Sequence, residues 1–189
     1  MNRRLFLGFP LVAAAMGHGA ALANEQGKRP APPKKGIRVG HGKDRFQDEL
    51  LMMGGRFDCK VSGKDTNGQL CIYDTFRQER GGPALHLHYE QDEWFYVIKG
   101  EFIIRVGDDQ FNLKAGDCAF APRKVPHTFA NVTDGPAQML VLLQPAGTIE
   151  VFFKEMSKLG RNIPKDWQKN LAQLMRNHGM ELVGPPLKI

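Results

Sequence analysis

Residues 86–93 have the sequence HLHYEQDE, and Gly100 follows after six further residues. Alternate residues of a β-strand face the same side, so His86 and His88 would present both imidazoles to one side of an extended chain. A hairpin after them would return Glu93 beside the pair. Imidazole nitrogen and carboxylate oxygen are ligands of transition metals, but an isolated histidine pair is more often only a polar feature of a strand. The rest of the sequence decides between these interpretations.

A second stretch supplies a further ligand. Residues 121–131, APRKVPHTFAN, contain His127 at the end of a turn-like segment, with Phe129 and Asn131 on the same strand face. Three imidazoles and one carboxylate leave one or two open positions on a five- or six-coordinate divalent ion. This donor set suits Fe, Mn, Co, Ni or Cu, with Zn as a further candidate, and does not favour Ca or Mg.

The segment around these two stretches consists of short β-rich runs separated by turn residues. Glycine, Asp-Gly-Pro or proline interrupts the pattern at short intervals, which is typical of an antiparallel sandwich or barrel. The expected strands are FDCKVS, QLCIYDTF, ALHLH, EWFYVIKG, EFIIRVG, QFNLKAG, CAFAP, HTFANV and AQMLVLLQ. We therefore predict an all-β barrel over residues 46–147.

The pattern changes after Pro145. Two stretches, TIEVFFKEMSKLG and PKDWQKNLAQLMRNHG, repeat apolar residues at helical spacing and predict two amphipathic helices within a C-terminal extension, residues 148–189. The apolar faces are expected to contain Ile149, Phe152, Phe153, Met156 and Leu159 in the first helix, and Trp167, Leu171, Leu174 and Met175 in the second, with Pro164 in its first turn. They are expected to pack against the barrel; the alternative is a lid over a substrate entrance.

The first residues resemble an export signal. Residues 1–23 combine a basic start, a short apolar stretch and a small-x-small site at Ala21 to Ala23, after which we expect cleavage. The Arg3-Arg4 pair resembles the twin-arginine signal of bacteria, with an ordinary Sec signal or a retained anchor as alternatives. The chain is therefore expected to be periplasmic or extracellular, with no stable membrane span after cleavage.

A basic Pro/Gly/Lys segment, residues 24–45, is interpreted as a flexible linker. The formal net charge of +6 falls to +4 if cleavage removes Arg3 and Arg4. This excess is weak, and no aromatic residues interleave the basic segment, so no nucleic-acid site is expected. With 189 residues and 42% hydrophobic content, the chain is expected to form one core.

Three cysteines do not form a disulfide framework. Cys59 and Cys71 lie in two strand-like runs on either side of an Asn67-Gly68 turn signal, and a register symmetric about Asp65 would place them opposite each other. Both a disulfide and two packed thiols are compatible with that arrangement. The absence of CxxC spacing argues against a metal site that includes Cys118.

The two histidine stretches together resemble the conserved motifs of the cupin superfamily. The first motif is His-x-His, three or four residues, Glu, six residues and Gly, which corresponds to His86, His88, Glu93 and Gly100. The second is matched by Gly116, Pro122, His127 and Asn131. The resemblance covers about residues 50–145 and implies a double-stranded β-helix of jelly-roll type. It also implies a metal held by His86, His88, Glu93 and His127.

This sequence departs from the family pattern at two turns. Lys124 occupies the position of a glycine in the second motif, and Gly81 lies five residues before His86 where the family has six. Both departures concern backbone conformation more than ligand identity.

The local sequence is most similar to small single-domain proteins grouped with quercetin 2,3-dioxygenase. That resemblance implies a metal-dependent dioxygenase that cleaves a phenolic or enolic small molecule with O₂, with Glu93 as both ligand and catalytic base. The alternatives are a non-catalytic cupin that binds a sugar or carboxylate, and a metal-dependent isomerase or decarboxylase, because the fold does not specify the reaction. A homodimer is expected by resemblance alone.

Strand parity gives a candidate substrate pocket. Phe95 and Val97 are expected on the face of Glu93, and Phe129 and Asn131 on the face of His127. Aromatic and aliphatic side chains beside a metal would suit a flat aromatic substrate. The same apolar residues would equally serve as barrel core, and Asn131 would either orient a ligand or cap a turn.

Overall fold

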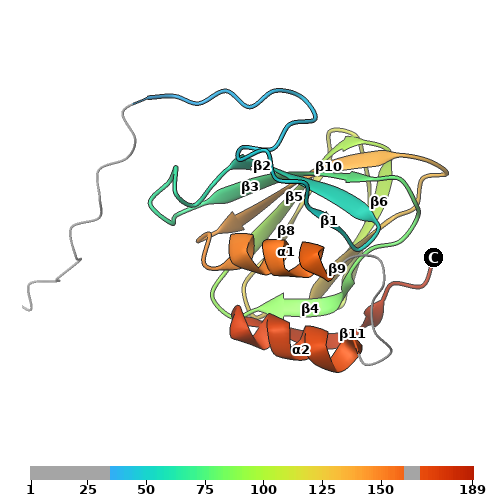
Figure 1. Ribbon diagram of the computed structural model, residues 1–189. Coiled ribbons are helices and arrows are strands. Elements are labelled where there is room, and N and C mark those ends of the chain that lie inside the picture. The colour runs from blue at the N-terminus through green and yellow to red at the C-terminus, as the bar shows by residue number, and fades with distance from the viewer. Residues whose placement is uncertain (1–34, 160–166) are drawn as a thin grey trace, which may run out of the picture.

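A computed structural model describes residues 35–159 and 167–189 of the chain (Figure 1). The predicted export signal, the first part of the linker and Pro164 lie outside the described residues. Within the described part of the chain, neither helix has the length and hydrophobicity needed to span a membrane.

The barrel consists of two antiparallel sheets. The six-stranded sheet has the order β1 (Leu51–Met52), β2 (Gly55–Val61), β3 (Cys71–Arg77), β10 (Ala137–Gln144), β5 (Asp92–Lys99) and β8 (Cys118–Ala121). The five-stranded sheet has the order β11 (Met180–Pro186), β4 (Ala84–His88), β9 (His127–Asn131), β6 (Glu101–Val106) and β7 (Asp109–Lys114). All nine predicted strands are present, as β2 to β10, and the prediction of an all-β barrel with two C-terminal helices is confirmed.

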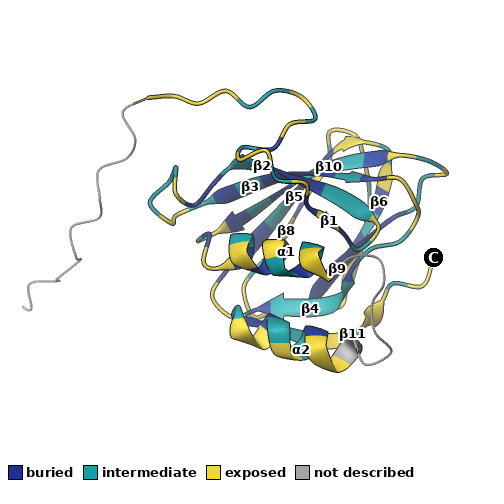
Figure 2. Cartoon of the chain, in the orientation of Figure 1, coloured by how far each residue is buried: buried dark blue, intermediate teal, exposed yellow. Residues whose placement is uncertain are grey.

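The core fills the space between the inner faces of the two sheets, where the buried positions concentrate (Figure 2). Strand β10 shows the alternation expected of a sheet with one buried face: Ala137, Met139, Val141 and Leu143 point inward. The helix α1 (Ile149–Lys158) adds its apolar face, with Ile149, Phe152, Phe153 and Met156 buried. Leu159, which we expected on that face, is 41% exposed because it lies beyond the end of the helix.

The C-terminal tail forms a strand that the sequence analysis did not predict. After the helix α2 (Trp167–Asn177), β11 pairs with β4, with Met180 opposite His88 and Leu182 opposite His86. Gly184 and two prolines obscure this strand in the sequence, and a register shift precedes Pro186. The tail therefore supports the strand that carries the histidine pair.

The register symmetric about Asp65, which would place Cys59 opposite Cys71, is not the observed one. Cys59 faces Tyr73, and a bulge after Cys59 shifts the register so that Val61 faces Ile72. Both cysteines are buried free thiols. The predicted turn at Asn67 and Gly68 is present, and both residues adopt a positive φ.

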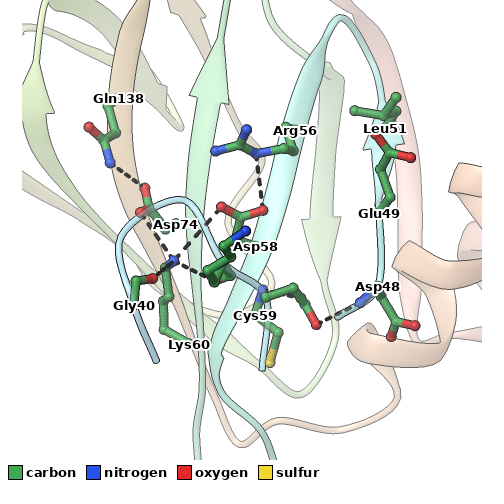
Figure 3. A network of polar contacts seen from close by, with 12 residues as sticks. Gly40, Asp48, Glu49, Leu51, Arg56, Asp58, Cys59, Lys60, Asp74 and Gln138 are labelled. Carbon is green, nitrogen blue, oxygen red and sulfur yellow. Dashed lines mark hydrogen bonds and ion pairs between the residues drawn. The ribbon is translucent and has the colours of Figure 1, made fainter. Parts of the chain in front are cut away.

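A polar network ties the chain before the barrel to the outer face of the six-stranded sheet (Figure 3). Lys60 lies 3.6 Å from Asp74 and 3.8 Å from Asp58, and donates to the carbonyl groups of Gly40 and Lys43. The Asp44 carboxylate accepts the backbone N–H of Cys59 at 2.6 Å. The last residues of the segment interpreted as a linker are therefore bonded to the barrel.

Another part of the outer face of the six-stranded sheet carries a row of apolar side chains. One residue from each of four neighbouring strands lies in register there, and none of the four side chains is buried: Ile72, Leu142, Trp94 and Phe120. The next row contributes Leu140 and Tyr96. Outward positions of an antiparallel sheet are usually polar, so this row is an exception.

Candidate metal centre

Four side chains from three strands converge inside the barrel. His86 and His88 extend from β4, Glu93 from β5 and His127 from the start of β9, and one potential ligand atom from each lies within 4.8 Å of the others. Strand β4 pairs with β9 directly at His86 and His127, whose ring centroids are 4.7 Å apart. The two sheets thus bring together the four residues that the motifs singled out.

Backbone carbonyl groups fix the orientation of two of the imidazoles. The Nδ1 of His86 lies 2.8 Å from the carbonyl oxygen of Ala84, and the Nδ1 of His127 lies 2.9 Å from that of Val125. A carbonyl oxygen only accepts, so in each contact Nδ1 carries a proton and Nε2 is the nitrogen directed toward the cluster. Nε2 is then the atom available to a metal.

Gln91 provides the corresponding acceptor for His88. Its Nε2 donates to the carbonyl oxygens of Pro145 at 2.9 Å and Ala146 at 2.7 Å, which leaves Oε1 facing the Nδ1 of His88 at 3.1 Å. All three histidines therefore present Nε2 to the cluster. Sequence reasoning missed Gln91, because nothing in the spacing of HLHYEQDE distinguishes it from Glu90.

Hydrogen bonds determine the charge of Glu93. Burial by itself would raise the pKa of this carboxyl group, but the contacts of its Oε2 with Nε2 of His127 at 2.8 Å and of His88 at 3.3 Å lower the pKa overall. Glu93 is therefore ionised, as a metal ligand must be.

The environment shifts the pKa values of His86 and His127 in opposite directions. Burial, together with the neighbouring His127 and His88, lowers the pKa of His86 to about 3, so that His86 is neutral near pH 7. Burial also acts to lower the pKa of His127, but the bond to Glu93 raises it overall. A metal ion would displace the proton shared by His127 and Glu93. The donor set fits a divalent transition metal.

The cluster adjoins a small apolar cavity of about 50 Å³, with room for a few water molecules in this conformation. His86, His88 and Glu93 contribute to its wall. The remaining wall is almost entirely apolar and includes both helices: Met53, Phe57, Phe129, Val141, Leu143, Ile149, Phe152, Phe153, Leu171, Met175 and Met180.

Of the four residues predicted to form the substrate pocket, only Phe129 lies in the cavity wall. Phe129 lies in the cavity wall, with its ring centroid 5.8 Å from that of Phe95. Phe95 and Val97 are buried in the core and do not belong to the described wall. Asn131 bonds to a turn, donating to the carbonyls of Glu79 and Gly135 and accepting the N–H of Thr133. The helices, which the strand pattern could not place, supply five residues of the wall: Ile149, Phe152, Phe153, Leu171 and Met175.

Lys124 keeps the conformation of the glycine that it replaces in the motif. Its φ is +67°, a left-handed value that favours glycine, and its N–H donates to the carbonyl of His88 at 2.7 Å. The turn before His127 therefore anchors the end of β4 despite the substitution.

Comparisons with known proteins find similarity over part of this chain. Residues 75–143 match the family model described as a cupin domain. An uncharacterized protein of Methanocaldococcus jannaschii is 31% identical over 61 residues, which cover 32% of this chain and 49% of that protein. A 3-hydroxyanthranilate 3,4-dioxygenase of Xanthomonas campestris pv. campestris is 36% identical over 55 residues, which cover 25% of this chain and 31% of the enzyme. This chain thus spans half or less of these curated relatives.

Among solved structures, an RmlC-like cupin from Shewanella frigidimarina is 23% identical, with a TM-score of 0.45 and coverage of 57% of this chain and 93% of that one. The narrower resemblance to quercetin dioxygenases stays a prediction. The matched segment contains His86, His88, Glu93 and His127. Over residues 75–143, this chain therefore matches the cupin domain family.

Proposed function

We propose that the domain is a metal-dependent dioxygenase that acts on a phenolic or enolic small molecule. The observation that carries the proposal is the position of the buried His₃Glu cluster at the wall of an apolar cavity. A polar centre at one end of an apolar cavity suits a ring with a hydroxyl group. The match to a relative named as a dioxygenase supports the reaction class.

The side chains have distinct roles in this proposal. A transition metal bound by His86, His88, Glu93 and His127 would supply Lewis-acid and O₂ chemistry. Glu93 is ionised and is held by imidazoles rather than by backbone N–H groups, so its Oε2 is the candidate acceptor for a substrate hydroxyl proton. Phe129 and Phe152 would pack on the substrate and exclude water.

The size of the cavity limits the substrate. A volume of about 50 Å³ does not admit a flavonol without displacement of the wall, whereas a single ring requires a smaller movement. A one-ring substrate is therefore favoured over a polyphenol.

Metal analysis combined with O₂ uptake tests the proposal. We expect one transition metal ion per chain in the wild type, its loss in His88→Ala, and its retention in His178→Ala. His178 is a matched control, because it bonds to Thr148 and Glu155 outside the cluster. Wild type reconstituted in turn with Fe, Mn, Co, Ni, Cu and Zn should consume O₂ with a catechol, a diketone or a flavonol.

Metal-replete protein that consumes no O₂ with any of these compounds would refute the dioxygenase. Turnover without O₂ would instead support an isomerase or decarboxylase. Retention of an unaltered ligand by protein that binds zinc alone would support a binding role. Export, cleavage after Ala23 and homodimer formation belong to the same proposal and rest on the sequence.

A further inference from the structure

Arg77 is a buried arginine at the end of β3, and it is not part of the metal cluster. Its side chain is 3% exposed and lies on the inward face of the strand, like those of Tyr73 and Thr75. One guanidinium nitrogen, Nη2, donates to the carbonyl oxygen of Met53. The other two, Nε and Nη1, have no hydrogen-bond partner among the described residues.

This guanidinium also lacks a counter-ion within the described part of the chain, where no carboxylate lies within ion-pair distance of it. Burial lowers the pKa of Arg77 to about 10 although the negative charge of Glu79 acts to raise it, so the group is still protonated near pH 7. An enclosed cation with two unpaired nitrogens destabilises a fold unless another group satisfies it. A buried cation that the fold satisfies only in part is a candidate for ligand recognition.

The surroundings of Arg77 connect it with the cavity. Its guanidinium lies 5.7 Å from the ring centroid of Phe129, and both Phe129 and Met53 line the cavity wall. The π-face of Phe129 compensates part of the charge but accepts no in-plane hydrogen bond. Arg77 therefore lies directly behind the wall, at the side away from the histidines.

Met53 separates this cavity from a surface groove. It lines both the cavity and a groove bordered by Glu49, Met52, Gly55, Phe76 and Glu79. Met53 and Gly54 form the turn between β1 and β2, and both residues have positive φ values. This turn lies close to the guanidinium, because a Cβ atom added at Gly54 would be 3.5 Å from Nη2 of Arg77. An unbranched methionine side chain can repack more easily than the aromatic residues of the wall.

We propose that Arg77 binds the carboxylate of the substrate, and that Met53 moves aside to admit it. The inference rests on the proposed function, because it takes the cavity as the substrate site. Phe129 lies two residues beyond His127, about 6.6 Å along β9, and Arg77 lies beyond Phe129. The hydroxyl group and the carboxylate must therefore lie at opposite ends of the ligand, as in a para-hydroxylated aromatic acid.

Equilibrium binding to the purified full chain, measured by calorimetry without O₂, tests this assignment. The probes are 4-hydroxybenzoate and 4-hydroxycinnamate, each compared with its neutral primary amide. We expect at least one of the acids to bind the wild type at least tenfold more tightly than its amide. Arg77→Met should weaken binding of that acid at least tenfold and leave the amide within twofold, and Arg77→Lys should give an intermediate value. Arg80→Met removes an exposed arginine paired with Asp134 and should behave as wild type.

Two results would overturn the inference. One is a folded Arg77→Met variant that keeps its affinity for the acid within twofold; the other is a wild type that binds neither acid more tightly than its amide. Circular dichroism establishes folding, and Arg77→Lys and Arg77→Gln replace the methionine variant if it does not fold.

O₂ uptake, measured separately, distinguishes this inference from the proposed function. An acid bound through Arg77 with no O₂ consumed would refute the dioxygenase alone. Oxidation of acids and neutral phenols that Arg77→Met leaves unchanged would refute the carboxylate site alone.

Discussion

Three different acceptors bind the Nδ1 atoms of the three histidines and direct Nε2 of each toward the cluster. Two are backbone carbonyls close in sequence, at Ala84 and Val125, and therefore come with the strand ends themselves. The third is the side chain of Gln91, which depends on Pro145 and Ala146 far along the chain. His88 is thus the ligand whose orientation is most sensitive to a single substitution outside the cluster.

Gln91→Leu tests this dependence. The leucine removes the acceptor for Nδ1 of His88, so we expect metal affinity to fall about 10- to 100-fold, as for other groups that orient metal ligands. Competition with a chromophoric chelator measures the affinity.

Gln138→Leu is the matched control, because Gln138 bonds to Asp74 on the outer face of the sheet. An affinity unchanged in Gln91→Leu would show that packing alone orients His88.

At the level of elements, α1 closes the barrel beside the cavity. Phe153 packs edge-on against Tyr73 with ring centroids 4.8 Å apart, and lies 5.3 Å from Phe57. These contacts join the helix to β2 and β3. The helix is therefore part of the barrel core as well as part of the cavity wall.

Phe153→Ala should destabilise the protein strongly. Loss of a buried aromatic ring in a packed core costs about 3 to 5 kcal/mol in the free energy of unfolding. Guanidinium chloride titration measures this change. Val151→Ala, at a position 50% exposed on the same helix, should change the free energy of unfolding by less than about 0.5 kcal/mol. Equal effects of the two substitutions would contradict a core role for α1.

At the level of the whole molecule, the two sheets differ in what they present to solvent. The outer face of the six-stranded sheet carries the apolar row of Ile72, Leu142, Trp94 and Phe120, with Phe120 54% exposed on the edge strand β8. An apolar row without charges can pair with its own copy about a two-fold axis. The proposed homodimer would bury this row.

Phe120→Lys should therefore convert a dimer into a monomer. A lysine at this position would bring two like charges together in a two-fold interface and would leave an unpaired charge there. Sedimentation velocity measures the molecular mass. Phe111→Lys is the matched control, because Phe111 is 41% exposed on β7 of the other sheet. A wild type that sediments as a monomer would refute the dimer.

The parts of the structure that follow local rules were predictable from the sequence. Strand alternation and turn residues predicted nine strands, and the motif spacing of His86, His88, Glu93 and His127 predicted that these four residues form one cluster. The features that were missed depend on distant partners: β11 forms only because β4 offers an edge, and Gln91 acts only because Pro145 lies beside it. The bulge at Cys59 likewise has no clear local signal.

The ligand cluster joins the two sheets, since Glu93 belongs to one sheet and the histidines to the other. A bound ion would therefore connect the two sheets through its ligands. By mass action, an ion present at a hundred times its dissociation constant adds about 2.7 kcal/mol to the free energy of unfolding. The stability of the fold would then depend on the metal content of its surroundings, and a compartment that sequesters the metal would lower the free energy of unfolding.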